Sequence, residues 1–213
     1  MSKPSKKESP FRRRPAFRPL RESFLILCEG ERTEPLYFNA FRLATATVRA
    51  LPVTPGDAMA VVRAAIKRRD TETDNGKLYD HYWVVFDKDA TPNNVFNAAI
   101  SLARDSGFRV AYSNQAFELW FLLHFSYISG TMHRDQYADR LTALLGFPYG
   151  KHGDTARLMF RALYDRQPLA VENARRLYNQ HSEADKSAPR NPAAEESSTT
   201  VYELVELLRT FRE

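Results

Sequence analysis

Two short apolar runs, each ending in a carboxylate, constrain the fold of this sequence more than any other feature. The run "FLILC", residues 24–28, leads directly into Glu29, and the run "WVVF", residues 83–86, leads into Asp87. Runs of this length that are rich in branched and aromatic side chains are typical of buried β-strands. Because segments of helical length and periodicity separate them, the pattern predicts βαβ units around a mainly parallel sheet.

The remaining pattern divides the 213 residues into expected elements. Strands are expected at 23–28, 48–53, 81–87 and 108–112, and helices at 34–46, 57–69, 93–105 and 115–126. Beyond Gly130 the strand signals end, and helices are expected at 133–145, 153–164 and 168–181. The sequence therefore predicts an α/β core over residues 22–130, with residues 131–213 forming a helical region that packs on it.

The closing segment "TTVYELVELLRTF" predicts an amphipathic helix after a polar loop at 182–200. Thr199 or Thr200 is the expected N-cap, and Glu203, three residues after Thr200, would complete a capping box. Four apolar residues fall on one face of this helix: Val201, Leu204, Val205 and Leu208. We expect the helix to be exposed, which makes it the candidate contact for a homodimer.

The net charge of +5 is unevenly distributed along the chain. Residues 1–21 contain eight Lys or Arg and one acid, whereas the rest contains 23 bases and 25 acids. Four prolines and the lack of apolar periodicity predict that this basic tail is disordered in the free protein. It is either a solubilising tail or an arm that binds phosphates through Arg12, Arg13, Arg14 and Arg18, with Phe11 and Phe17 available to stack on bases.

Cysteine content and hydropathy limit the setting in which the chain works. Cys28 is the only cysteine, so no intramolecular disulfide can form, and the reducing cytoplasm is the expected location. No apolar run approaches the ~20 residues of a membrane span, so no membrane partner is expected. The basic tail also lacks the apolar core of a secretory signal.

Acids follow both strong strands at the point where each strand ends. In a parallel sheet the carboxyl ends of the strands share one edge, so Glu29, Asp87 and Asp89 are expected to converge there. The two aspartates are two residues apart at a strand end and should point the same way. Carboxylates so close together repel each other unless a cation lies between them, and oxygen ligands suit Mg²⁺ or Mn²⁺. The alternative is that the aspartates form the N-cap and turn of the next helix.

Other charged residues near the expected site have competing interpretations. Glu31 and Glu34 are interpreted as first-turn acids that oppose the dipole of the following helix. Arg32, at the same helix start, is either a surface residue or a clamp for a phosphate. Glu118 either compensates the dipole of its own helix, or acts as an additional metal ligand or a carboxylate that orients the site.

Amide and imidazole side chains add candidates for substrate positioning. Asn114 and Gln115 follow the strand expected at 108–112 and would lie on the same edge as the acids. His124 is interpreted first as a core histidine hydrogen-bonded to the backbone, and second as a positioning residue. It follows Glu118 by six residues, roughly 120° around a helix, so the two side chains need not share a face.

The strand-end motifs resemble those of a known fold. "CEGERTE" after one strand and "FDKDA" after a later one are similar to the motifs of the Toprim fold, whose members carry a Glu after the first strand and an Asp-x-Asp after a later strand. This resemblance implies that Glu29 acts in acid/base chemistry and that Asp87 and Asp89 hold Mg²⁺. No clean second set of acids for another metal is found in the sequence, which leaves the number of metals open.

Four segments in order resemble the RloB family: "ILCEGERTEPLYFNAF", "VVFDKDA", "SNQAFELWFLLHF" and "STTVYELVELL", spread over residues 24–209. This family is a Toprim-related group associated with bacterial restriction and abortive-infection loci. The resemblance implies a Toprim-like core and a role in anti-phage defence. It also implies a partner subunit encoded in the same defence locus.

Three functions remain open on this basis. The leading hypothesis is a nuclease that depends on Mg²⁺ or Mn²⁺, cuts DNA or RNA, and uses Glu29 for proton transfer. A non-catalytic subunit that binds nucleic acid or nucleotides would keep the fold and serve as a defence sensor. A phosphatase of the haloacid-dehalogenase type would use "FDKDAT", with Asp87 as nucleophile and Asp89 as acid/base. That motif normally opens its domain, whereas here 86 residues precede Asp87.

Overall fold

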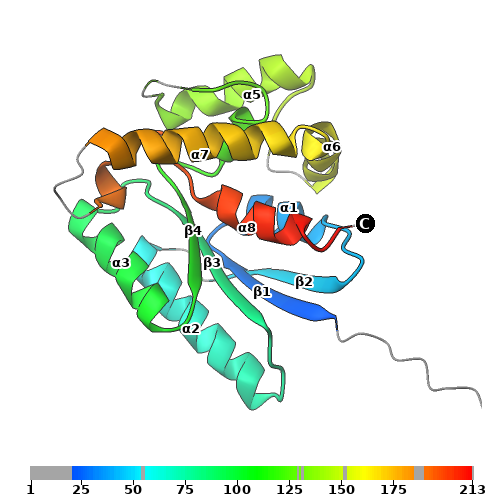
Figure 1. Ribbon diagram of the computed structural model, residues 1–213, viewed down its shortest axis with the longest axis vertical. Helices are drawn as coiled ribbons and strands as arrows, with labels where there is room; N and C mark the ends of the chain where they lie inside the picture. Colours follow the sequence, from blue (N-terminus) through cyan, green and yellow to red (C-terminus); the bar gives the residue numbers. More distant parts are fainter. Residues whose placement is uncertain are drawn as a thin grey trace, which may run out of the picture.

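The computed structural model describes residues 21–53, 56–128, 130, 132–150, 153–184 and 190–212. These residues form one sheet of four parallel strands with helices on both faces (Figure 1). The strands are β1 (Glu22–Cys28), β2 (Ala46–Pro52), β3 (His81–Asp87) and β4 (Arg109–Ser113), in the order β2-β1-β3-β4. The predicted α/β class with a parallel sheet is confirmed, and the arrangement is consistent with a Rossmann-like fold.

The register of the strands brings their carboxyl ends to one edge. Cys28, at the end of β1, lies opposite Val85 of β3, and Asp87 lies opposite Ser113 of β4. Because the strands are parallel, the residues that follow β1, β3 and β4 all leave the sheet on the same side. Ligands of open parallel sheets bind at this edge, so it is where a functional site is expected.

Helices cover both faces of the sheet. α2 (Ala58–Asp74) and α3 (Asn93–Asp105) cover one face, and α1 (Thr33–Asn39) and α8 (Val201–Arg209) lie against the other (Figure 1). The second side also carries α4 (Glu118–Leu122), α5 (Tyr137–Leu145), α6 (Gly153–Tyr164) and α7 (Gln167–Ala184). Short 3-10 turns lie at Arg134–Gln136 (η1) and Pro192–Ala194 (η2).

Alternation along each strand builds an apolar layer on each face. Leu25 and Leu27 of β1 pack in the layer that includes α2 and α3, whereas Phe24 and Ile26 pack with residues of α1, α4, α7 and α8. All four side chains are fully buried. Consecutive side chains of a strand point to opposite faces, so a strand between two layers is apolar throughout. This is why the run "FLILC" is continuous rather than alternating.

Two helices end at positions that differ from the prediction. The helix expected at 34–46 ends at Asn39, whose side-chain amide exchanges hydrogen bonds of 2.8 and 2.9 Å with the backbone of Ala50 in β2. This exchange fixes the chain where it turns towards β2. α2 continues beyond the expected range of 57–69, because Glu72 on its last turn is buried and pairs with nearby arginines.

The helix expected at 115–126 is reduced to the five residues of α4. Asn173 of α7 donates a hydrogen bond of 2.8 Å to the carbonyl of Leu123, which takes that carbonyl out of a helical ladder. The contact between two helices thus competes with continuation of the first. No helix within the described ranges combines the length and the apolar character that crossing a membrane demands.

The C-terminal helix is confirmed, but its cap and its exposure differ from the prediction. Thr200 occupies the N-cap position as predicted, yet its hydroxyl oxygen accepts a hydrogen bond of 3.0 Å from the backbone N–H of Tyr112 in β4 and makes no cap bond. The Thr199 hydroxyl oxygen instead accepts a bond of 3.3 Å from the backbone N–H of Val201, the first residue of α8. The four residues of the predicted apolar face are buried. Figure 1 shows α8 between the sheet and α7. The helix is therefore packed rather than exposed, and its apolar face is not available to a second copy.

Candidate active site

The carboxyl ends of β1 and β3 are joined by a carboxylate. Glu29, the residue after β1, donates its backbone N–H to the carbonyl of Val85 at 2.9 Å. Its side-chain oxygen Oε2 accepts a hydrogen bond of 2.9 Å from the backbone N–H of Asp87. The Asp87 oxygen Oδ2 in turn accepts a bond of 3.0 Å from the backbone N–H of Phe117. The structure thus brings Glu29 and Asp87 together at the sheet edge.

Asp87 lies at the centre of a group of acids. Its oxygen Oδ1 is buried and has no hydrogen-bond partner within the described residues. Burial raises the pKa of Asp87 well above that of an ordinary aspartate, and the carboxylates of Glu34, Glu29 and Glu118 raise it further. A buried oxygen among like charges is a place that a cation would stabilise.

Glu34 belongs to this group, although its position in the first turn of α1 indicates a role in dipole compensation. The side chain is only 6% exposed. A methyl group at Gly30 would lie 1.9 Å from the Glu34 oxygen Oε2, so the turn after β1 needs a glycine for the carboxylate to pack there. The signal in the sequence is the Glu-Gly pair followed by an acid four residues after the glycine.

Glu118 begins α4 and is held by a tyrosine that sequence reasoning did not identify. The Tyr149 hydroxyl donates a hydrogen bond of 2.8 Å to the Glu118 oxygen Oε1. Burial raises the pKa of Tyr149, and the Glu118 carboxylate raises it further, so the hydroxyl keeps its proton and remains a donor. Tyr149 lies in the loop between α5 and α6, where no local pattern indicates a site residue.

Asp89 points to an arginine from a distant part of the chain. Its carboxylate forms an ion pair with Arg134 of η1. β3 ends at Asp87, and Asp89 has a φ of 42°, in the left-handed region, so the alternation of a strand does not extend to it. Neither aspartate caps the next helix, because α3 follows Pro92 with no side-chain cap. The alternative role of the aspartates as an N-cap is therefore not what the structure shows.

Two neighbouring clefts open over this edge. The carboxylate cleft has a volume of about 350 Å³, and its charged lining consists of Glu29, Glu31, Glu34, Asp87, Asp89, Glu118, Arg32 and Arg134. The amide cleft has a volume of about 770 Å³, and its polar lining includes Lys88, Asn93, Asn114, Gln115, His133, Gln180 and His181. Asp89 and Arg134 line both clefts, so the ion pair marks the junction between them.

The acids of the carboxylate cleft match the chemistry of a hard divalent cation. Carboxylate oxygens are the ligands that Mg²⁺ and Mn²⁺ prefer, and the buried Asp87 oxygen supplies one such donor. Among the described residues as placed, no three His, Cys, Asp or Glu side chains are arranged to hold one ion. The types of residue in the cleft fit a divalent cation, whereas their present arrangement does not enclose one. Asp89 is paired with Arg134 and would have to leave that arginine to become a metal ligand.

The predicted positioning residues separate into two groups. Asn114 and Gln115 follow β4 and line the amide cleft. His124 lines neither cleft and is fully buried, where its Nδ1 donates a hydrogen bond of 2.8 Å to the carbonyl of Trp120. Burial lowers the pKa of His124 to about 3. The first interpretation of His124, a core histidine bonded to the backbone, is confirmed.

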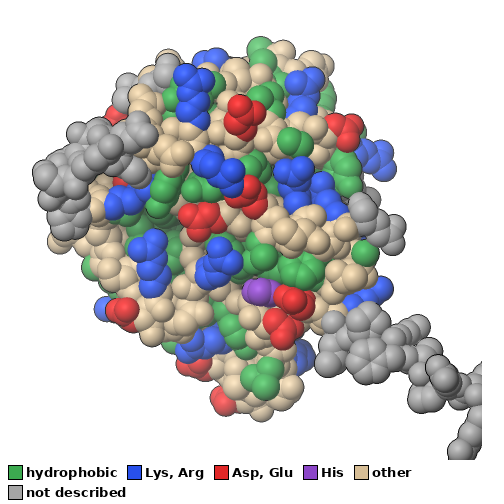
Figure 2. All heavy atoms as spheres, viewed as in Figure 1, with side chains coloured by type: hydrophobic (Ala, Val, Ile, Leu, Met, Phe, Trp, Pro, Cys, Tyr) green, Lys and Arg blue, Asp and Glu red, His purple; other side chains and the backbone are tan. Residues whose placement is uncertain are grey.

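The predicted phosphate-binding arginines also separate. Arg32 is exposed at the start of α1 and lines the carboxylate cleft. Arg12, Arg13, Arg14 and Arg18 lie outside the described residues. Figure 2 shows that Lys and Arg side chains on the face seen there alternate with Asp and Glu rather than forming one basic patch. The described residues on this face therefore form no single basic surface.

The fold and the edge together define an α/β protein that gathers carboxylates where parallel sheets bind their ligands. A family model described as RloB-like protein matches residues 24–208, which is most of the chain. The chain therefore belongs to the RloB-like family. Neither a curated protein nor a solved structure matches it significantly.

Proposed function

We propose that this RloB-like protein is a metal-dependent nuclease whose reaction centre is the carboxylate cleft. The observation that carries the proposal is the convergence of Glu29, Glu34 and Glu118 on the buried Asp87. Four acids, from the residue after β1, the end of β3, the first turn of α1 and the start of α4, repel each other, and a divalent cation bound among them would relieve that repulsion. A buried carboxylate whose pKa is raised at the ligand-binding edge of a parallel sheet is a candidate for catalysis.

The acids have separate roles in the proposed reaction. Asp87, with Asp89 and Glu118, would hold Mg²⁺ or Mn²⁺, and Glu34 adds a carboxylate that the sequence motifs did not include. The ion would neutralise phosphate charge and activate water when bound. Glu29 is oriented by its bond to the Asp87 N–H and would take or relay the proton of the attacking water. Arg32 and Arg134 line the same cleft and would bind phosphate oxygens.

The biological setting is part of the same proposal. The resemblance to Toprim enzymes supports the metal chemistry, and the association of the RloB family with restriction and abortive-infection loci supports a role in anti-phage defence. A second subunit from such a locus is the proposed partner, and the cytoplasm is the proposed location. The phosphatase hypothesis gains no support, because its motif would follow the third strand in sequence rather than the first.

A non-catalytic binding subunit is the second candidate. It is favoured by the ion pair between Asp89 and Arg134, which neutralises one expected metal ligand. A binding protein would use the same positive and polar groups to hold nucleic acid without cutting it. Metal-dependent turnover separates the two candidates.

The test is cleavage of labelled single- and double-stranded DNA and RNA by the full chain with Mg²⁺, with Mn²⁺ and with a chelator. We expect metal-dependent cleavage that falls by about 10² or more in Glu29→Gln, since proton transfer contributes factors of that order. Gln at this position can still accept the Asp87 N–H bond, so the fold is preserved. Asp105→Asn, an exposed acid at the end of α3, is the matched control and should retain full activity. Binding without turnover under every condition would instead support the non-catalytic candidate.

A further inference from the structure

The amide cleft lies directly beside the proposed reaction centre. Asp89 and Arg134 line both clefts, so a ligand that crosses this ion pair would occupy the two together. At about 770 Å³, the amide cleft falls within the range of roughly 300–1,000 Å³ that is typical of ligand-binding clefts. It is large enough for a ligand of nucleotide size.

The lining of the amide cleft is polar and mostly neutral or cationic. Amide groups come from Asn93, Asn114, Gln115 and Gln180, and cations come from Lys88 and Arg134. The acids of the lining are Asp89, which is paired, and Glu196. Amides donate and accept at once, which suits the hydrogen-bonding edges of nucleobases, and cations suit phosphates. Imidazoles from His133 and His181 add rings of the kind that stack on unpaired bases.

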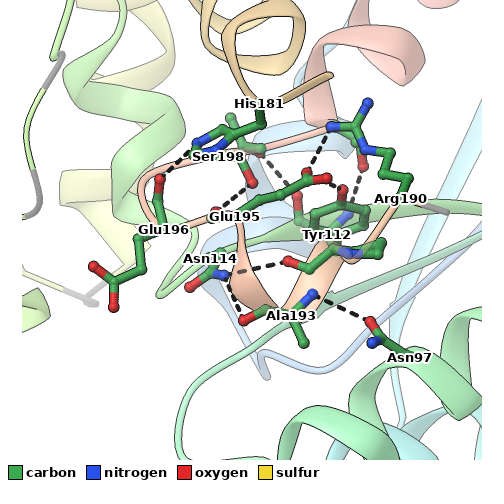
Figure 3. A network of polar contacts seen from close by, with 12 residues as sticks. Asn97, Tyr112, Asn114, His181, Arg190, Ala193, Glu195, Glu196 and Ser198 are labelled. Atoms are coloured by element: carbon green, nitrogen blue, oxygen red, sulfur yellow. Dashed lines mark hydrogen bonds and ion pairs between the residues drawn. The ribbon is translucent and has the colours of Figure 1, made fainter. Parts of the chain in front are cut away.

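One wall of the cleft is the segment that precedes α8, and it is tied to the rest of the fold. Figure 3 shows this segment beside the end of β4. The backbone N–H of Asn114 donates a hydrogen bond of 2.8 Å to the carbonyl of Ser198. On the other side, the backbone N–H of Ala193 donates to the Asn97 side chain at 3.1 Å (Figure 3). The wall is therefore anchored to both β4 and α3.

Further side-chain contacts hold the same wall in place. Glu195 pairs with Arg190 at 2.6 Å and accepts a hydrogen bond of 3.2 Å from the hydroxyl of Tyr112 (Figure 3). His181 of α7 donates through Nε2 to the carbonyl of Glu196 at 2.9 Å. A wall that is fixed before a ligand arrives loses little conformational freedom on binding, which favours affinity.

Gln115 positions the ion pair at the junction of the clefts. Its carbonyl accepts the backbone N–H of Asp89 at 3.1 Å, and its side-chain Oε1 accepts the backbone N–H of Arg134, also at 3.1 Å. A guanidinium group binds phosphate as readily as carboxylate, with two parallel hydrogen bonds. Arg134 is therefore placed to exchange Asp89 for the phosphate that connects a nucleotide in one cleft to the bond cut in the other.

We infer that the amide cleft binds an unpaired nucleotide next to the scissile phosphate, so that the substrate is single-stranded where it is cut. This inference rests on the proposed nuclease function and names its substrate class. In a duplex the pairing edges of the bases are occupied by the other strand, and only an unpaired base presents them to amides in a cleft. Amides and cations can bind the bases and phosphates of either polymer, so RNA and DNA are tested side by side.

The test measures binding separately from cleavage. Fluorescence anisotropy of the full chain, with a chelator present, compares one sequence as single-stranded RNA, single-stranded DNA and the corresponding duplexes. The variant Asn93→Ala/His133→Ala/Gln180→Ala removes three exposed side chains of the lining. The matched control is Asn94→Ala/Asn179→Ala, two exposed neighbours that do not line the cleft.

We expect the triple variant to bind single strands about tenfold more weakly or worse, with the control unchanged and duplex binding weak throughout. Equal affinity for duplex and single strand, or unchanged binding by the triple variant, would overturn the inference. Metal-dependent cleavage at equal rates on single strands and duplexes would overturn the proposed role of the amide cleft, while the proposal of a nuclease would still stand. Strand-selective binding that the triple variant loses, without cleavage by the wild type, would support the cleft and overturn the nuclease.

Discussion

The Glu29 carboxylate accepts the backbone N–H of Asp87 at 2.9 Å, and this single bond joins the ends of β1 and β3 across the sheet edge. It fixes the Glu29 side chain over the neighbouring strand rather than leaving it in solvent. It also places a second negative charge beside the buried Asp87. Contacts between protein groups therefore fix the geometry of the site, and a cation bound there would offset the negative charge that the acids bring together.

Replacing Asp87 with Asn should stabilise the protein when no divalent cation is present. The amide oxygen can still accept the Phe117 N–H, while the repulsion from the surrounding acids disappears. We expect a gain of about 1 kcal/mol, which corresponds to roughly 2–4 °C in Tm for a chain of this size. Calorimetry with a chelator checks this, and Mg²⁺ should raise the Tm of the wild type but not of Asp87→Asn. Asp105→Asn is the control and should keep the wild-type Tm. A lower Tm for Asp87→Asn alone would contradict the claim that the acids around Asp87 repel it.

Gly30→Ala should disturb the site without unfolding the protein. The new methyl group would lie 1.9 Å from the Glu34 carboxylate, so that side chain has to move out of the group around Asp87. Overpacking of this kind costs about 1–3 kcal/mol. We expect a lower Tm and a Mg²⁺ response reduced to that of Glu34→Gln. Gly130→Ala is the control, because none of the described residues has an atom within 4 Å of a methyl group there. A wild-type Tm and a wild-type Mg²⁺ response in Gly30→Ala would show that Glu34 takes no part in binding the metal.

The sheet could be predicted from the sequence because its strands are buried on both faces. Phe24 to Cys28 and Trp83 to Phe86 are continuous apolar runs, and few other structures accommodate such runs in a globular protein. The place of Glu29 and Asp87 at one edge then follows from parallel topology alone. Helix ends are less predictable, because side chains from other elements, such as Asn173 on Leu123, decide them.

The rest of the site depends on contacts between segments far apart in the sequence. Arg134 reaches Asp89 from 45 residues further along the chain, and Tyr149 reaches Glu118 from 31. No local sequence pattern predicts either contact. The prediction that Asp89 points the same way as Asp87 relied on strand alternation, which does not extend to Asp89 because its backbone is left-handed, although both side chains line the carboxylate cleft. The pattern around Glu34 indicates helix electrostatics because acids are common in first turns whether or not they are buried.

Deleting residues 1–21 should weaken binding of nucleic acid and flatten its salt dependence. Removal of one arginine that binds a phosphate of a single strand reduces the slope of log affinity against log salt by about 0.7, so removal of four corresponds to a change of roughly 3. Anisotropy titrations between low and physiological salt measure this slope. Arg12, Arg13, Arg14 and Arg18 changed together to Ala should reproduce the deletion. An unchanged slope in both would identify the tail as a solubilising segment only.

Acid should destabilise the protein through His124. Burial lowers the pKa of His124 to about 3, whereas the unfolded chain binds this proton near pH 6.5. Between these values the unfolded state holds more protons, so stability falls as pH decreases, by up to about 1.4 kcal/mol per pH unit. Denaturant melts from pH 7 to 4 should show a shallower decline for His124→Phe than for the wild type. Leu78→Phe, at an exposed position with no ionisable group, should keep the wild-type decline; equal slopes in all three would contradict the assignment.

Arg134→Ala should change metal and nucleic-acid binding in opposite directions. Removing the guanidinium frees Asp89 and leaves the carboxylate cleft more negative, so the Mg²⁺ concentration that stabilises the protein should fall several-fold. The same change removes a phosphate contact, so binding of single strands should weaken and its salt slope should decrease by about 0.7. Tm against Mg²⁺ and anisotropy against salt measure the two effects, with Arg140→Ala on the exposed side of α5 as the control. An unchanged Mg²⁺ response would show that Asp89 is not a metal ligand. Unchanged binding of single strands would show that Arg134 does not contact the nucleic acid.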